Sequence, residues 1–277
     1  MIIAITMVKN EANIISYSIR HLKANGVDGI IMADNNSVDG TAEVAKDVSR
    51  LIGYDITIID EPSLGYYQSA VMTKLYNLAI SRGARWIIPF DADELVIASD
   101  MKISEALNLS RDKVVLGLRV YDHCPTNIDG NRDNDNPFLK WPFRKIDPQP
   151  IGKIIVQNLG PDLTILQGNH GVRLRGEPIR AYESDIMQIR HFRFYNGFES
   201  YAKSAVEKLE AYENTDLPES VGSHWRLYGR IARDYGADIL AKELRKNFSV
   251  EFDKDGKINL NNGATADVIY DPAPWRG

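Results

Sequence analysis

The first hundred residues alternate between short apolar runs and segments with helical periodicity. Short apolar runs bounded by turn residues indicate buried strands, and apolar residues three or four positions apart indicate one face of a helix. The alternation predicts right-handed helical crossovers and therefore a mostly parallel sheet covered by helices. The predicted strands are residues 2–8, 29–33, 56–59 and 86–90, and the predicted helices are residues 11–25, 39–51 and 67–80.

The remainder of the chain gives fewer clear signals. Residues 122–150 are rich in Asn, Asp, Pro and Gly, which predicts a long loop. Residues 253–256 predict the turn of a hairpin. There is no repeat and no clear linker, so we expect a single domain over residues 1–277. Further strands are predicted at residues 114–121, 153–157, 163–167 and 186–192, and further helices at residues 198–212 and 224–247.

The composition is that of an ordinary soluble globular protein, with 44% hydrophobic and 26% charged residues. A net charge of −5 argues against nucleic-acid binding, which usually requires a basic face. Cys124 is the single cysteine, so no intrachain disulfide can form and a reducing compartment is expected. Neither a signal peptide nor an apolar run long enough to span a membrane is recognisable, so we expect a cytoplasmic protein without an integral membrane segment.

Two carboxylates, Asp91 and Asp93, directly follow the apolar run at residues 86–90. If the backbone stays extended there, side chains two residues apart point the same way and both can face one hard cation. Carboxylates with space for water and phosphate oxygens suit Mg²⁺ or Mn²⁺. The alternative is structural, because an Asp-x-Asp triplet is common by chance and often caps a helix.

Polar clusters also follow two other predicted strands, at residues 9–11 and 34–37. In open parallel sheets, ligands bind outside the carboxyl ends of the strands. The three clusters, including Asp91 to Asp93, therefore predict one shared binding edge.

Four motifs carry a resemblance to a known family. They are residues 7–11, 21–27, 34–41 and 90–94, and in this order and spacing they resemble a family-two-like glycosyltransferase with the GT-A fold. The resemblance covers the first hundred residues well and continues more weakly to about Lys203. It implies a GT-A-type, Rossmann-like α/β/α sandwich with a mostly parallel central sheet and extra C-terminal strands and helices.

The resemblance also implies an activity. Such an enzyme transfers a sugar, here expected to be a hexose, from a nucleotide-diphosphate sugar to a saccharide or another hydroxyl acceptor. A UDP-sugar is the expected donor, and Mn²⁺ or Mg²⁺ at the Asp-x-Asp (DXD) motif is the expected cofactor. The implied organisation is a nucleotide-sugar-binding half at residues 1–122, an acceptor and metal-completing half at residues 123–212, and a C-terminal helical extension at residues 213–277.

Individual roles follow from matching positions. The implied metal ligands are Asp91, Asp93 and His191, although His191 could equally be a buried structural histidine. The implied catalytic residues are His170 and Glu177, with Asp162 and Glu183 as other candidates for the base. Trp141 is expected at the acceptor site. The implied donor-binding residues are Thr6, Val8, Asn10, Glu11, Asp34, Gln68, Lys74, Asp91, Ala92 and Lys203.

Two other functions stay open at this point. One is a nucleotidyltransferase acting on a sugar phosphate, but that class usually has a Gly-rich loop after the first strand, and residues 6–11 contain no glycine. The other is a non-catalytic module that binds a nucleotide sugar. Stereochemical outcome and oligomeric state do not follow from the residues.

Overall fold

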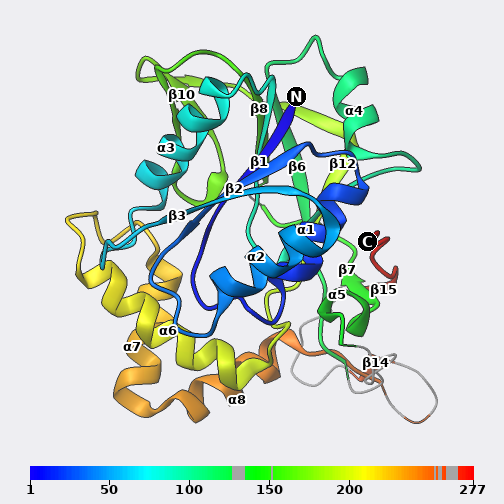
Figure 1. Ribbon diagram of the computed structural model, residues 1–277. Helices are drawn as coiled ribbons and strands as arrows, with labels where there is room; N and C mark the ends of the chain where they lie inside the picture. The colour runs from blue at the N-terminus through cyan, green and yellow to red at the C-terminus, as the bar shows by residue number, and fades with distance from the viewer. Residues whose placement is uncertain (127–134, 151, 253, 255–257, 260–267) are drawn as a thin grey trace.

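The computed structural model describes residues 1–126, 135–150, 152–252, 254, 258–259 and 268–277. Within these residues, a central sheet has eight strands, and β8 and β5 run opposite to the others (Figure 1). In spatial order the strands are β3 (Asp55–Asp60), β2 (Gly29–Asp34), β1 (Ile2–Val8), β4 (Trp86–Pro89), β8 (Lys153–Gln157), β6 (Val115–Asp122), β12 (Tyr182–His191) and β5 (Glu94–Ala98).

Helices cover both faces of this sheet, and the predicted α/β/α sandwich with a mostly parallel sheet is confirmed. Three later helices lie together at the bottom of Figure 1, and two of them lie in residues 213–277, where a C-terminal helical extension is expected. The longer helices are α1 (Ile15–Ala24), α2 (Thr41–Ile52), α3 (Gln68–Ser81), α4 (Ile103–Leu109), α6 (Phe198–Glu213), α7 (Ser223–Tyr235) and α8 (Ala237–Phe248).

Shorter elements complete the described chain. A three-stranded sheet consists of β9 (Leu163–Ile165), β10 (Val172–Leu174) and β11 (Glu177–Ile179). Two strand pairs are β7 (Phe143–Lys145) with β15 (Val268–Tyr270) and β13 (Glu251–Phe252) with β14 (Ile258–Asn259). The short helical segments are α5 (Pro137–Lys140) and η1 (Gln167–Asn169).

Side-chain alternation along β1 explains the layers. Ala4 lies in the core under α1, whereas Ile5 lies in the core under α3. Each helix presents one apolar stripe to its side of the sheet, with Ile19 of α1 and Leu75 of α3 both fully buried. The period of two in the strand and of 3.6 in the helices thus produces two cores separated by one sheet.

The central sheet contains strands from residues 123–212 as well as from residues 1–122. Strand β8 lies between β4 and β6, and β12 pairs with β6 and β5. Residues from both predicted halves therefore build one sheet. The described part of the chain contains no helix that combines the length and the apolar character needed to cross a membrane.

Some predicted elements need correction. Residues 224–247 form two helices rather than one, because Gly236 adopts φ 104° between α7 and α8 and interrupts the helical hydrogen bonding. The loop predicted at residues 122–150 contains α5 and β7, and its residues 127–134 lie outside the described residues. The predicted turn at residues 253–256 lies almost wholly outside them, but the antiparallel pairing of β13 with β14 agrees with a hairpin.

The packing of α6 against α7 depends on Gly229. A Cβ atom at this position would lie 2.4 Å from Cβ of Leu209 and 2.5 Å from the carbonyl oxygen of Ala205. Both distances are shorter than van der Waals contact, and the second atom belongs to helix backbone. The two helices can therefore approach this closely only with glycine at the crossing.

We expect Gly229→Ala to destabilise the protein by about 1–3 kcal/mol, because the added methyl group overpacks the helix crossing. Helix propensity alone would have the opposite sign, since alanine is favoured over glycine by about 1 kcal/mol in a helix interior. Urea unfolding of the variant tests this, with Lys242→Ala on the exposed side of α8 as the control. An increase in stability for Gly229→Ala would contradict the close packing.

Candidate functional site

Asp91 and Asp93 lie in the turn that connects β4 with the antiparallel β5. The expectation of an extended backbone at this triplet is wrong, because the chain reverses here and the Glu94 N–H donates to the Asp91 carbonyl, at 3.0 Å. Two contacts hold the turn: the Ser18 hydroxyl donates to the Ala92 carbonyl at 2.6 Å, and the Phe192 N–H donates to the Asp93 carbonyl at 2.9 Å. The two carboxylates consequently have different neighbours.

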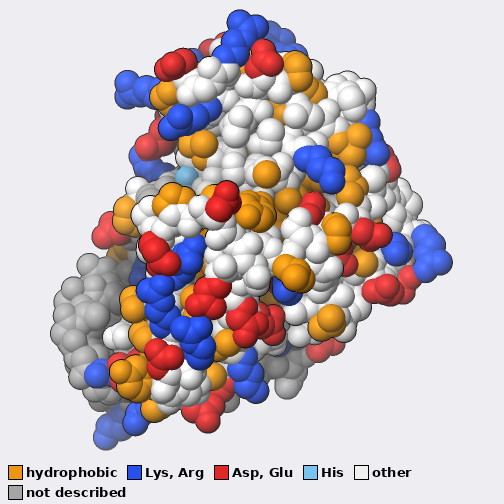
Figure 2. Space-filling view, turned by 90° about the vertical axis from the view of Figure 1, so that its left-hand side faces the viewer, with side chains coloured by type: hydrophobic (Ala, Val, Ile, Leu, Met, Phe, Trp, Pro, Cys, Tyr) orange, Lys and Arg blue, Asp and Glu red, His pale blue; other side chains and the backbone are white. Residues whose placement is uncertain are grey.

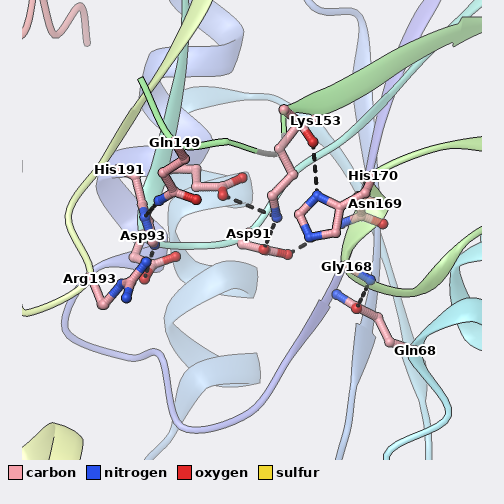
Figure 3. A network of polar contacts seen from close by, with 12 residues as sticks. Gln68, Asp91, Asp93, Gln149, Lys153, Gly168, Asn169, His170, His191 and Arg193 are labelled. Carbon is pink, nitrogen blue, oxygen red and sulfur yellow. Dashed lines mark hydrogen bonds and ion pairs between the residues drawn. The ribbon is translucent and has the colours of Figure 1, made fainter. Parts of the chain in front are cut away.

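The Asp91 carboxylate contacts a buried lysine. Lys153 Nζ lies 2.5 Å from Asp91 Oδ2 and 3.1 Å from Glu94 Oε1, and Asn169 Nδ2 donates to Asp91 Oδ1 at 3.3 Å (Figure 3). Burial opposes the charged form of Lys153, but Asp91 and Glu94 outweigh it and hold the lysine pKa above its usual value. Burial raises the pKa of Glu94 to about 7.

The Asp93 carboxylate contacts a histidine. His191 Nε2 lies 3.3 Å from Asp93 Oδ2, and His191 Nδ1 lies 2.8 Å from Asp122 Oδ1. Gln149 Nε2 also donates to Asp122 Oδ1, at 2.9 Å. Burial disfavours the imidazolium, but Asp93 and Asp122 together raise the pKa of His191 to about 10. Burial likewise disfavours the Asp93 carboxylate, but His191 outweighs it and lowers the Asp93 pKa to about 2.

Glu11 and Lys208 face the same cluster from other elements. The Tyr195 hydroxyl donates to Glu11 Oε2 at 2.6 Å, and burial, reinforced by Asp93, raises the pKa of Glu11 to about 8. Lys208 on α6 interacts electrostatically with Glu11, Asp93 and Asp91, while burial lowers its pKa. Its ammonium nitrogen also lies 3.8 Å from the ring centroid of Trp225.

Lys208 is a site residue that the sequence analysis missed. The expected donor-binding lysine, Lys203, is exposed on the same helix. Five residues rotate a helical position by about 140°, so the two lysines point in different directions. The register of α6 against the sheet decides which lysine faces the carboxylates, and no local motif marked that register.

The predicted donor residues that follow β1 and β2 are tied together. Asn10 Oδ1 accepts from the Val38 N–H at 2.9 Å, and the Glu11 N–H donates to Thr41 Oγ1 at 2.8 Å. Asp34 Oδ1 accepts from the Ser37 N–H at 3.1 Å, which closes the turn after β2. Thr6 and Val8 are both buried within β1. The structure therefore brings the first two predicted polar clusters together at one edge.

Gln68 and His170 meet through the η1 segment. Gln68 Oε1 accepts from the Gly168 N–H at 2.8 Å, and His170 Nδ1 lies 2.8 Å from the Gly152 carbonyl oxygen. Gly168 has φ 73°, and a Cβ atom there would lie 2.5 Å from the His170 ring. Glycine thus allows the imidazole to fold over this turn. Burial lowers the pKa of His170, so the ring is neutral near pH 7.

Three predicted residues lie elsewhere. Glu177 is exposed in β11 and, among the residues described, makes no hydrogen bond or ion pair with the carboxylate cluster. Lys74 is exposed, with its nitrogen 3.9 Å from Glu61 Oε2. The expectation of Trp141 at an acceptor surface is wrong, because its side chain packs in the core and is 8% exposed.

The side chains that could bind a metal ion can be compared with the ligands that a divalent ion requires. Among the described residues, no group of three or more His, Cys, Asp or Glu side chains is arranged to hold a metal. Asp93 and His191 nevertheless converge, whereas Asp91 is paired with Lys153. Mg²⁺ is usually held by one or two carboxylates together with substrate phosphates and water. Asp93 and His191 therefore fit an ion that is shared with a phosphate ligand, provided that the ion displaces the proton from His191 Nε2.

The His191 pKa has a consequence for stability. A pKa raised from 6.5 to about 10 stabilises the folded state fully below pH 6.5, and this contribution is lost as the pH rises toward 10. Asp93, with its lowered pKa, stays charged throughout that range. We expect the stability difference between the wild type and His191→Gln, measured in urea with a chelator present, to shrink between pH 6.5 and 10.

His224→Gln is the control for this experiment. Desolvation lowers the pKa of His224 to about 4, so its charge does not change in the same range. If wild type and His191→Gln show parallel pH dependence, His191 is not a buried cation between Asp93 and Asp122.

Comparisons with known proteins can be set beside this geometry. No curated protein matches the chain. Among solved structures, residues 1–349 of TarS from S. aureus in complex with UDP are 13% identical, with a TM-score of 0.41 over 89% of this chain and 77% of that one. The mannosyltransferase PcManGT from Pyrobaculum calidifontis in complex with GDP-Man and Mn2+ is 14% identical, with a TM-score of 0.42 over 88% and 73%. Neither likeness bears on ligand or reaction.

The amino-acid sequence also matches a protein family. The family model described as glycosyl transferase family 2 matches residues 3–166, which is more than half of the chain. The matched segment includes β1 to β8 and thus the turn with Asp91 and Asp93. The chain belongs to glycosyl transferase family 2.

Proposed function

We propose that this protein transfers a sugar, in the first instance a hexose from a UDP-sugar, to a hydroxyl group of an acceptor. The observation that carries the proposal is the convergence of Asp93 and His191 at the carboxyl edge of the sheet of a family 2 glycosyltransferase. In open α/β sheets this edge is where ligands bind. A divalent ion, Mn²⁺ or Mg²⁺, shared by these two side chains and the donor diphosphate, would neutralise the charge of the leaving group.

The chain supplies further positive charge for a diphosphate. Lys208 faces the cluster from α6, and Lys153, at the start of β8, contacts Asp91 within it. Preorganised cations that meet developing negative charge lower the barrier to group transfer without reorganising at the moment of reaction. Lys203 and Lys74, both exposed, stay candidates for weaker contacts with the donor.

We assign donor binding to the edge formed by the ends of β1, β2 and β4. Thr6, Val8, Asn10, Glu11 and Asp34 supply the proposed base and ribose cradle. Gln68 joins it from α3, and Ala92 joins it from the turn between Asp91 and Asp93.

His170 is our first candidate for the general base. It adjoins Asn169, whose amide contacts Asp91, and its imidazole is neutral near pH 7 and able to accept a proton. Glu177 is the second candidate, with an exposed carboxylate that an acceptor could reach.

A thermal-shift screen of nucleotide diphosphates and nucleotide sugars, each with Mn²⁺, Mg²⁺ or chelator, tests the proposal. A ligand that binds only the folded state raises the melting temperature. A shift with UDP or a UDP-sugar that disappears with chelator supports a metal-dependent donor site. A shift without sugar transfer to any acceptor would favour a binding module, and formation of a nucleotide sugar from a sugar phosphate would indicate a nucleotidyltransferase.

Asp93→Asn should weaken Mn²⁺-supported UDP binding by about a hundredfold or more, because the ion loses a negatively charged carboxylate ligand. Isothermal titration with and without Mn²⁺ measures the effect. Asp47→Asn, at an exposed position on α2, is the matched control and should bind UDP as the wild type does. Unchanged Mn²⁺-dependent affinity in Asp93→Asn would refute the ligand assignment.

A further inference from the structure

Lys153 contacts Asp91, a residue of the Asp-x-Asp motif that was expected to bind the metal ion. Lys153 is the first residue of β8, which runs antiparallel to β4 and therefore starts beside the end of β4. Its side chain is 8% exposed, and its ammonium group contacts both Asp91 and Glu94. Removing such a charge from water is costly unless partners are placed to compensate it.

Both carboxylates around Lys153 already have polar partners, although the Asp91 side chain is 32% exposed. Both Asp91 oxygens already accept hydrogen bonds, Oδ2 from Lys153 and Oδ1 from Asn169. Glu94 is 2% exposed at its side chain, and within the described residues its Oε2 atom is buried without a hydrogen-bond partner. The arrangement therefore places two acidic groups against one ammonium group, with one buried oxygen still unsatisfied.

We propose that Lys153 is a built-in cation that holds Asp91 out of the metal's coordination shell, leaving Asp93 and His191 as the direct ligands. The inference deepens the proposed function and, for the roles of Asp93 and His191, rests on it. Lys153 is a positioning residue, because it acts on the ion through Asp91. Its charge also lowers the negative field of the cluster, so an anionic diphosphate can approach the same edge.

If Lys153 has this role, removing its charge should strengthen the binding of a divalent ion and weaken the binding of a diphosphate. In Lys153→Met, Asp91 and Glu94 lose their counter-charge, and the partly exposed Asp91 carboxylate becomes available to a divalent ion. The same change leaves the site more negative, which repels a diphosphate in the absence of metal. A lysine that only supported the fold would weaken both kinds of binding or neither.

The test compares wild type, Lys153→Met and Lys46→Met, which removes a lysine from the exposed side of α2. Mn²⁺ binding without nucleotide is measured from the electron paramagnetic resonance signal of the free ion, and UDP binding is measured by calorimetry in chelator. We expect Lys153→Met to bind Mn²⁺ at least about tenfold more tightly and UDP at least about tenfold more weakly. Lys46→Met should match the wild type in both measurements.

Two further variants identify the group involved. Asp91→Asn added to Lys153→Met should remove most of the gain in Mn²⁺ affinity. Asp91→Asn alone should weaken Mn²⁺ binding by about tenfold, a loss typical of a residue that acts on the ion through another group and clearly smaller than that of Asp93→Asn. This single variant keeps the proposal testable if Lys153→Met fails to fold. A loss as large as that of Asp93→Asn would show that Asp91 is a direct ligand and overturn the proposal.

The outcomes separate this inference from the proposed function. If the wild type does not bind Mn²⁺ but Lys153→Met does, the lysine is the built-in cation and the proposed metal dependence is wrong. If the wild type binds Mn²⁺ and UDP but Lys153→Met binds Mn²⁺ equally or more weakly, the role given to Lys153 is wrong and the proposed function stands.

Discussion

Compensation of buried charge at the end of β4 organises this molecule. Asp91, Asp93 and Glu94 lie within one turn, and each needs an opposite charge or water. The partners come from distant segments: Lys153 from the start of β8 and His191 from the end of β12. These contacts require that β8 lies next to β4 and that β12 lies between β6 and β5 in the sheet. The order of the strands therefore determines which charges meet at the site.

The C-terminal region extends the same principle. Helix α6 brings Lys208 toward the cluster, and its close crossing with α7 depends on Gly229. Farther along, Asp271 accepts from Arg144 Nε at 2.7 Å and from an Arg190 amino group at 2.6 Å, which ties the last residues to β7 and β12. Charged side chains of both signs are intermixed on the face in Figure 2. Negative and positive groups are thus balanced locally.

The elements with strong local signals were predictable. The strands of the first ninety residues follow from short apolar runs, and helices α2 and α3 follow from apolar residues at helical spacing, because each helix has one buried stripe. Errors arose where a single backbone angle or a tertiary contact decided the outcome. Gly236 splits one helical pattern into two helices, and Trp141, within a polar stretch, is drawn into the core. A periodicity argument contains neither the angle nor the contact.

The order of residues along the chain is enough to place Asp91 and Asp93 after a buried strand and polar residues at the ends of the neighbouring strands. Residues that follow neighbouring parallel strands lie at the same edge of the sheet, whichever contacts their side chains make. Which charged side chains meet at this edge depends on how the whole chain packs. Lys153, Asp122 and Lys208 carry no local motif, and their approach depends on strand order and helix register. Lys153 and Asp91 are 62 residues apart in the sequence. Side chains this far apart meet only because the whole chain packs in one way.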